Sequence, residues 1–185
     1  MRGRTIGIML AAAGVMASGC AMTGQAGDGA AMGGGTPGAM ATLRDASGAT
    51  KGTATFRQTG GGLQVMVRAT GMTPGPKGLH FHMTGKCDAP DFTTAGAHWN
   101  PSAMKHGKDS GMGPHMGDLP NIEIGADGTG SAETTVAGAT LTGGATPLLD
   151  ADGAAIIIHA GPDDYRTDPS GNSGGRMACG VVTAA

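Results

Sequence analysis

Short runs in which apolar and polar residues alternate occupy much of the chain after residue 40. A period of two is typical of a strand with one buried face. In LQVMVRA, for example, Leu63, Val65 and Val67 share one face. The run AAIIIHA, by contrast, is continuously apolar. The strands that we predict from these runs span residues 53–58, 63–69, 79–83, 154–160 and 176–182, and a hairpin is predicted over 122–136 with Asp127 and Gly128 at its turn.

The segments between these strands have no hydrophobic period and are rich in Gly and Pro. We expect a turn at 60–62 and loops at 72–78, 85–118 and 161–175. A loop as long as 85–118 is abnormal in a compact domain unless something orders it. No stretch has the pattern of an amphipathic helix of useful length. The pattern therefore predicts an all-β fold, a sandwich or barrel that has two long loops.

The composition agrees with a β protein that has many turns. The 185 residues include 37 Gly, whereas aromatic residues make up 3% and charged residues 14%. The formal net charge is −2, and the chain contains no block of Lys and Arg. These features exclude a typical nucleic-acid-binding protein. The length suits one domain with additional unstructured chain.

The first twenty residues differ from the rest. Arg2 and Arg4 precede a short apolar stretch, TIGIMLAAAGVMA, and ASGC then ends at Cys20. This arrangement resembles a bacterial lipoprotein signal, although Ala17 stands where Leu is usual. We predict a signal peptide over 1–19, a lipidated Cys20 with a flexible Gly/Ala tether over 20–39, and a folded domain over 40–185. The alternative is an ordinary signal peptide with an incidental cysteine. Both imply export, and we expect the periplasm or cell envelope.

The remaining cysteines, Cys87 and Cys179, form an even pair in an oxidising compartment. A disulfide is therefore the natural assignment. It would close a long loop, which the chain-entropy model values at roughly 4 kcal/mol.

Two histidines alternate on a predicted strand. His80 and His82 are two residues apart, so both rings lie on one face, whereas Leu79, Phe81 and Met83 lie on the other. Two neighbouring imidazoles are costly once protonated, so we favour a metal over an exposed histidine pair.

The long loop contains a second group of candidate ligands, which are His98, His106, His115 and Asp118. Three imidazoles and one carboxylate complete a tetrahedral zinc set and leave no place for water, as in structural sites. Such a site would order the loop. Its closure, and the lack of a Glu near the histidines, argue against a zinc hydrolase. His159 ends an apolar strand and is either a further ligand or a satisfied core residue.

Six motifs follow one another in order: GLHFH, GAHWNP, KHG, GPHMGDLPN, IIIHAGPDDY and GGRMACGVV. They closely resemble the copper/zinc superoxide dismutases, in particular the exported bacterial branch, from about Met40 to Val182. The resemblance implies a Greek-key eight-stranded β-barrel or sandwich with a metal and disulfide loop and a short electrostatic loop. It also implies an antioxidant oxidoreductase that dismutes superoxide to O₂ and H₂O₂ by alternating Cu(II) and Cu(I).

The resemblance further implies one copper and one zinc per subunit, with His98 bridging them and delivering a proton. Asp163 would hydrogen-bond a copper histidine and a zinc histidine together, with Asp164 as the alternative. The implied copper ligands are His80, His82, His98 and His159, and the implied zinc ligands are His98, His106, His115 and Asp118.

Arg176 matches the guanidinium that guides the anion beside the copper. In the family, backbone near the first disulfide cysteine holds this arginine. The loop 161–175 offers Arg166 as its one cation. Further steering of superoxide would then come from lysines in the other loop, and Lys86, Lys105 and Lys108 are the candidates.

Several questions stay open at this point. A non-catalytic copper- or zinc-binding envelope module on the same fold is the alternative function. The chain would be a monomer or a homodimer, with no nucleic-acid partner and with membrane contact only through the lipid anchor. Four methionines cluster around the metal loops and either help to load copper or simply fill gaps: Met83, Met104, Met112 and Met116.

Overall fold

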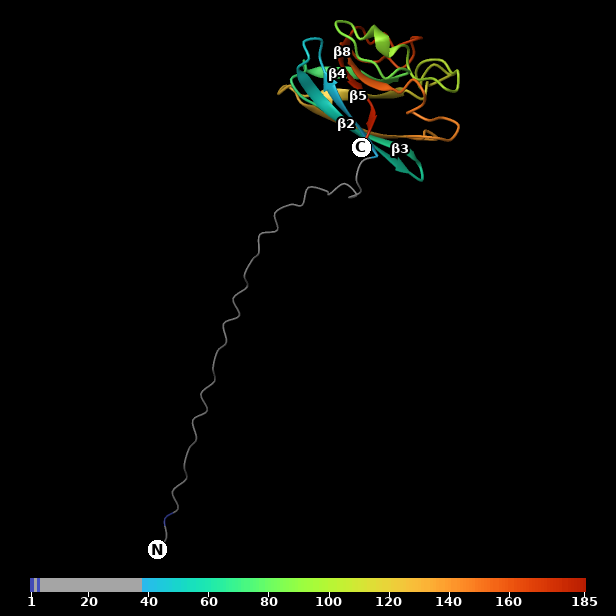
Figure 1. The fold of residues 1–185 in the computed structure, drawn as a ribbon. Coiled ribbons are helices and arrows are strands. Elements are labelled where there is room, and N and C mark those ends of the chain that lie inside the picture. Colours follow the sequence, from blue (N-terminus) through green and yellow to red (C-terminus); the bar gives the residue numbers. More distant parts are fainter. Residues whose placement is uncertain (2, 4–37) are drawn as a thin grey trace. The chain divides into compact units, whose positions relative to one another are not determined.

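The computed structural model describes residues 1, 3 and 38–185, and the described domain is a closed β-barrel (Figure 1). Apart from residues 1, 3, 38 and 39, the predicted signal peptide and tether, including Cys20, lie outside the described residues. Within the described part of the chain, no helix is long and apolar enough to cross a membrane. Among residues 38–185 the one helical element is the short 3₁₀ turn η1 (Thr93–Ala95). The strands are β1 (Ala39–Arg44), β2 (Thr50–Thr59), β3 (Gly62–Ala69), β4 (Gly75–His82), β5 (Asp118–Ile124), β6 (Gly130–Val136), β7 (Ala155–His159), β8 (Arg176–Val181) and β9 (Thr183–Ala184).

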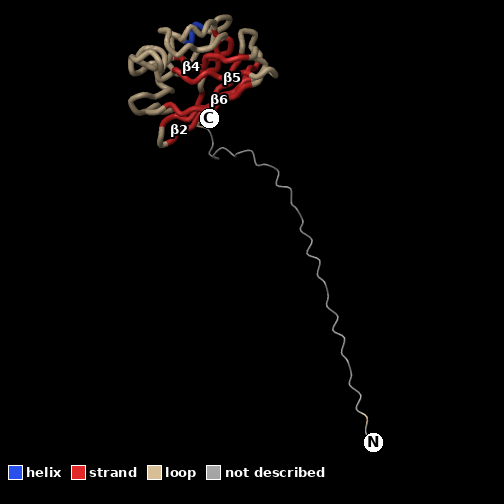
Figure 2. Tube along the Cα trace, turned by 180° about the vertical axis from the view of Figure 1, so that it is seen from behind, coloured by secondary structure: helices blue, strands red, loops and turns tan. Residues whose placement is uncertain are grey.

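Eight strands form the barrel in the order β1-β2-β3-β6-β5-β4-β7-β8, and the sheet closes where β8 meets β1. All pairings between these strands are antiparallel, and β9 adds a short pairing with the start of β1. The connections β3–β4 and β6–β7 cross over neighbouring strands, which is the Greek-key arrangement. The expected all-β Greek-key barrel with two long loops is confirmed. Figure 2 shows how strands dominate the domain and how long loops gather at one end.

Alternating side chains fill the barrel interior. In β1, Ala39, Ala41 and Leu43 point inward and are buried, while the residues between them are exposed. Phe56 of β2 meets Phe81 of β4 inside, with ring centroids 5.8 Å apart. This core holds the strands that present the histidines at fixed positions.

A second, smaller apolar cluster lies outside the barrel. Phe92 and Ala95 of the loop after β4 pack on Ala155, Ile157 and Cys179 of β7 and β8. The loop therefore covers the outer face of these strands, which explains why β7 is apolar at every position from Ala155 to Ile158. This apolar packing anchors the long loop independently of a bound metal.

The structure corrects one predicted element and adds another. Residues 72–78 were expected to be a loop, but β4 begins at Gly75, and Gly75 pairs with Ile124. Pro76 is tolerated because the pairing of β4 with β7 begins only at Leu79, so the missing N–H of Pro76 leaves no ladder bond unmade. The sequence pattern also does not predict β1, whose inward residues include two alanines with weak hydrophobic signal.

Candidate metal centre

Four buried histidines converge on the outer side of β4 and its neighbours. His80 and His82 come from β4, His159 ends β7 beside them, and His98 lies in the long loop, which is held to the end of β4 by a bridge between His82 and His98. Each ring is at most 6% exposed. One nitrogen from each of the four lies within 4.8 Å of the others. The structure thus brings together the residues predicted as the copper set: His80, His82, His98 and His159.

His82 and His159 each have one ring nitrogen that is held by a hydrogen-bond acceptor. His82 Nδ1 lies 2.9 Å from the Gly96 carbonyl oxygen, and His159 Nδ1 lies 3.2 Å from that of Gly174. A carbonyl only accepts, so each Nδ1 bears the proton and each Nε2 presents a lone pair. This is how proteins orient histidines toward a metal.

The remaining nitrogens of the copper set are buried, and none of them has a hydrogen-bond partner within residues 38–185. These atoms are His80 Nδ1, His82 Nε2, His98 Nε2 and His159 Nε2. Buried polar atoms are rarely left unsatisfied, so four of them facing one point indicate an ion that would satisfy all four. Four imidazole nitrogens suit copper.

The second set gathers around one carboxylate oxygen. Asp118 Oδ1 lies 2.9 Å from His98 Nδ1, 3.1 Å from His106 Nδ1 and 3.2 Å from His115 Nδ1. A tetrahedral zinc site with bonds of about 2.0 Å would have ligand–ligand edges of about 3.3 Å. The spacing therefore fits zinc with little movement. Asp118 Oδ2 is turned away and accepts hydrogen bonds from the backbone N–H groups of Gly107 and His115.

His98 belongs to both sets, with Nδ1 toward Asp118 and Nε2 toward the copper set. Burial lowers the pKa of His98 to about 4, of His82 to about 2 and of His159 to about 3. These rings are therefore neutral at pH 7, which is the state that binds a metal. Burial also opposes the charge of His106, but Asp118 and Asp163 outweigh it and raise the pKa of His106 to about 9.

Asp163 links the copper set to the zinc set, because its carboxylate contacts one histidine of each. Its Oδ2 lies 2.8 Å from His80 Nε2, its Oδ1 lies 2.9 Å from His106 Nε2, and Oδ1 also accepts the Tyr165 N–H. Burial raises the pKa of Asp163, but the hydrogen bonds from His106 and His80 outweigh it and hold the pKa far below its usual range. Asp163, and not Asp164, occupies this position, because Asp164 caps an exposed turn through the N–H groups of Arg166 and Thr167.

Asn121 holds Asp163 in place and was not among the sequence predictions. Its side-chain oxygen accepts the Asp163 N–H at 2.9 Å, and its Nδ2 donates to the Asp163 carbonyl at 3.0 Å. The Asn121 backbone N–H donates to the Tyr165 hydroxyl. The sequence signal was only that Asn121 ends the motif GPHMGDLPN, since no spacing rule relates it to Asp163.

Gly171 leaves room for these contacts. Its φ is +64°, and a Cβ added there would overlap Asp163 Oδ1 and touch His106 Nε2. The site thus needs glycine at this position for two reasons, the backbone conformation and the close approach.

A cleft of about 260 Å³ opens onto the copper set. Arg176 is the cation among its lining residues, which also include His82, His98, His159 and Ser170. The Arg176 guanidinium donates from Nη1 to the Phe92 carbonyl and from Nη2 to the Gly96 carbonyl, both at 2.6 Å. Its charge is thereby fixed at the mouth of the cleft, and desolvation by burial lowers the pKa of Arg176.

The lysines proposed to steer an anion do not line this cleft. Lys108 lies 2.8 Å from Asp109 and 4.4 Å from the centre of the Tyr165 ring. Lys86 and Lys105 are exposed. Arg166 is also exposed. Arg176 is therefore the one cation of the described residues that reaches the cleft lining.

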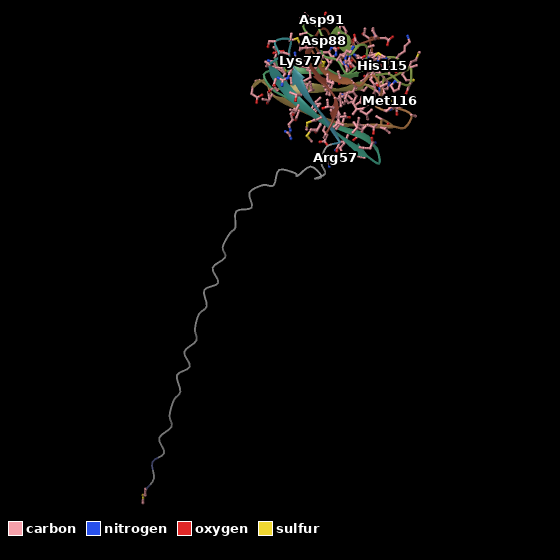
Figure 3. The ribbon with its side chains drawn as sticks, viewed as in Figure 1. Arg57, Lys77, Asp88, Asp91, His115 and Met116 are labelled. Atoms are coloured by element: carbon pink, nitrogen blue, oxygen red, sulfur yellow. A yellow bond between two sulfur atoms is a disulfide. The ribbon has the colours of Figure 1, made fainter. Side chains whose placement is uncertain are left out.

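The disulfide joins Cys87 to Cys179 with Cα atoms 5.7 Å apart. It ties the long loop to β8, the strand that begins at Arg176. Because Phe92 and Gly96 of the same loop hold the guanidinium, the disulfide and the arginine stabilise one arrangement. Figure 3 shows Asp88 and Asp91 of this loop at the end of the domain opposite Arg57.

Comparison with known proteins agrees with this geometry. Residues 50–182 match the family model for copper/zinc superoxide dismutase (SODC). A "Superoxide dismutase [Cu-Zn]" of Deinococcus radiodurans is 39% identical over 98% of each chain, and one of Caulobacter vibrioides is 41% identical over 78% of this chain and 84% of the relative. The crystal structure of a "SOD-like protein" from Bacillus subtilis has a TM-score of 0.73 at 39% identity, over 76% of this chain and 95% of that chain.

The family match covers both candidate metal sets, the disulfide and Arg176, and the relatives agree with it over most of the chain. The chain therefore belongs to the copper/zinc superoxide dismutase family.

Proposed function

We propose that this protein dismutes superoxide, converting two superoxide ions and two protons to O₂ and H₂O₂. The observation that supports this most strongly is the convergence of four unpartnered buried imidazole nitrogens beside Arg176 in one cleft. The nitrogens would hold copper, and the arginine supplies a fixed positive charge where a small anion would arrive.

We infer one copper and one zinc per chain. When bound, copper supplies the one-electron chemistry, by cycling between Cu(II) and Cu(I). The chain's own task is to hold the ligands, to exclude competing groups and to position the anion. The copper ligands would be His80, His82, His98 and His159, and the zinc ligands His98, His106, His115 and Asp118.

His98 has a second role in this proposal. Its Nε2 faces the copper set, whereas its Nδ1 is held with the zinc set, and the residue lines the cleft. The ring can therefore stay in place while Nε2 holds a proton for the bound anion. Because Nδ1 is held with the zinc set, Nε2 is the ring nitrogen that would hold this proton.

Arg176 binds the anion through its guanidinium. Two carbonyl oxygens already fix its orientation, so little entropy is lost when an anion binds. Asp163, held by Asn121, keeps His80 and His106 oriented and does not itself contact the cleft.

The non-catalytic metal-binding alternative is not favoured, because no element of the expected catalytic set is missing. We further propose that the protein is exported as a lipoprotein anchored through Cys20 and acts in the periplasm or cell envelope. The N-terminal sequence pattern supports this part of the proposal.

Metal analysis combined with a dismutation assay tests the proposal on the wild type and on Arg176→Ala. Arg166→Ala is the matched control, because Arg166 is a cation of the same loop region but is exposed outside the cleft. We expect Arg176→Ala to keep both metals and to lose most of its activity. We expect Arg166→Ala to keep both metals and its activity. Equal activity in all three proteins would refute the role of Arg176.

A further inference from the structure

A second cleft lies directly beside the first. It has a volume of about 510 Å³, and the two clefts share Ala97, His98 and Pro169 in their walls. His98, the residue common to both metal sets, thus lines both clefts. One opening contains Arg176, and the other contains none of the chain's lysines or arginines among its lining residues.

The second cleft has the opposite charge. Asp150, Asp152 and Asp168 line it. These carboxylates are exposed, so salt screens them, but a concave surface lined by one sign of charge still concentrates ions of the other sign. An anion is favoured in the Arg176 cleft, and a cation is favoured here.

Two methionines line the same cleft, and both reach solvent. Met83 is 47% exposed and Met104 is 42% exposed, so neither fills a gap in the core. Met116, in contrast, packs against the barrel core. A thioether that reaches solvent in the wall of a cleft is available to bind a soft metal ion.

Met83 is placed next to the copper set. It follows His82 in the chain, and its Sδ lies against Gly96, where it would be 3.5 Å from an added Cβ. The carbonyl of Gly96 accepts from His82 Nδ1 and from Arg176. A metal ion on this thioether would therefore lie close to the backbone that orients His82.

Met104, which lines the same cleft, is held by Asn100. The Asn100 Nδ2 donates to the Met104 carbonyl at 2.8 Å, and the Met104 N–H donates to Asn100 Oδ1 at 3.0 Å. This closed pair of hydrogen bonds fixes the backbone of Met104 within an otherwise irregular loop. The cleft is thus a built surface with two thioethers and three carboxylates.

We propose that this thioether cleft (Met83, Met104, Asp150, Asp152 and Asp168) is a transit site for Cu(I), which enters there and passes to the copper set through His98 and His82. Thioethers bind Cu(I) and have little affinity for zinc, so the two methionines would favour copper, although His98 and His115 also line this cleft. No electron is transferred in this step, because copper enters and leaves as Cu(I). The inference rests on the copper site of the proposed function.

Copper transfer to the zinc-loaded, copper-free full chain tests the proposal. Under anaerobic conditions, Cu(I) held by bicinchoninate is mixed with the protein, and the loss of the coloured complex gives the transfer rate. We expect Met83→Leu/Met104→Leu to acquire copper about tenfold more slowly than the wild type, with unchanged final copper content and unchanged activity once loaded. Met112→Leu is the control, because Met112 is 59% exposed but lies outside the cleft lining. Equal transfer rates in the double variant and the control would overturn the proposal.

A second measurement separates this site from the final one. His159→Ala removes a copper ligand that does not line the thioether cleft. We expect X-ray absorption of this variant with one equivalent of Cu(I) to show sulfur neighbours, and the addition of the two Met→Leu changes to remove them. Cu(I) bound without sulfur neighbours in His159→Ala would refute the transit site. Failure of dismutation in fully loaded wild type would instead refute the proposed function, because sulfur coordination in His159→Ala does not depend on activity.

Discussion

Replacing Asp163 with Asn would keep the size of the side chain but change what it can accept. Asp163 accepts from His80 Nε2 through one oxygen and from His106 Nε2 through the other, and it is 3% exposed. Asn offers one accepting oxygen and a donating NH₂ group. One of the two ring N–H groups must then face a donor.

The two rings differ in how firmly their backbones are held. His80 lies in β4 and pairs with Asp118 of β5 and Ile157 of β7, so it cannot move far. His106 lies in the loop before β5. We therefore expect His106 to move away and the zinc set to lose the greater share of its affinity.

The expected loss of metal affinity follows from the buried ring N–H group that loses its acceptor in Asp163→Asn. Leaving a buried N–H without an acceptor costs about 1–3 kcal/mol, and outer partners of metal-bound histidines contribute about 10–100-fold in affinity. We predict that Asp163→Asn weakens zinc by about 10–100-fold and copper by less.

Competition with a chromogenic zinc chelator would measure this, with a parallel titration of copper. Asp164→Asn is the matched control, because Asp164 is exposed and its carboxylate bonds only within its own turn, to Arg166 and Thr167. Wild-type zinc affinity in Asp163→Asn, or loss of copper with zinc intact, would refute the reasoning.

Three further predictions concern the disulfide, the pH dependence of stability and the space at Gly171. The double variant Cys87→Ala/Cys179→Ala should lose about 4–5 kcal/mol of unfolding free energy, measured by denaturant titration against the wild type; a loss below about 1 kcal/mol would contradict the loop-closure argument. In the metal-free protein, the three copper-set histidines with pKa values lowered by burial to about 2, 3 and 4 take up protons near pH 6.5 only when unfolded. Stability should therefore fall as the pH drops below about 6.5, by up to about 1.4 kcal/mol per pH unit for each histidine, and the metal-loaded protein should fall at least as steeply, because bound metal keeps the ligand histidines deprotonated in the folded state; a metal-free protein whose stability does not fall below pH 6.5 in denaturant titrations would contradict this. Gly171→Ala should release zinc because its Cβ would overlap Asp163. Gly143→Ala is the control, because Gly143 has a similar φ of +65° and open space around it, so this change should cost only about 1 kcal/mol of unfolding free energy and keep zinc. Equal retention of zinc by the two variants in a chelator competition would contradict the prediction for Gly171.

The hydrophobic pattern alone predicted most of the strands, because alternation is a local property. It placed His80 and His82 on one face of a strand, and both rings lie on the side of β4 away from the core. The pattern failed at Gly75 and Pro76, where turn-forming residues lie in the first part of β4, which is paired with β5 but not yet with β7. It also failed at β1, where small inward residues gave no clear period.

The site was predictable where ligand chemistry and spacing coincide. The loop residues His98, His106, His115 and Asp118 are close in sequence and of the types that zinc prefers, and they lie together. Asp163 and Arg176 needed the family resemblance, because their partners are far away along the chain and meet them only through barrel closure and loop packing. Neither the spacing of ligand residues nor the family resemblance predicted Asn121, because it holds the backbone of Asp163 and is not itself a ligand.

The most direct test of the account compares one purified chain in two metal states. The rate of superoxide decay would be followed by pulse radiolysis with the chain loaded with zinc alone and with zinc plus one equivalent of copper. The account predicts that the zinc form is inactive and that the copper–zinc form dismutes superoxide far faster than the same concentration of free copper, with a rate that falls as ionic strength rises because of the charge of Arg176. A copper–zinc form no faster than free copper would contradict it.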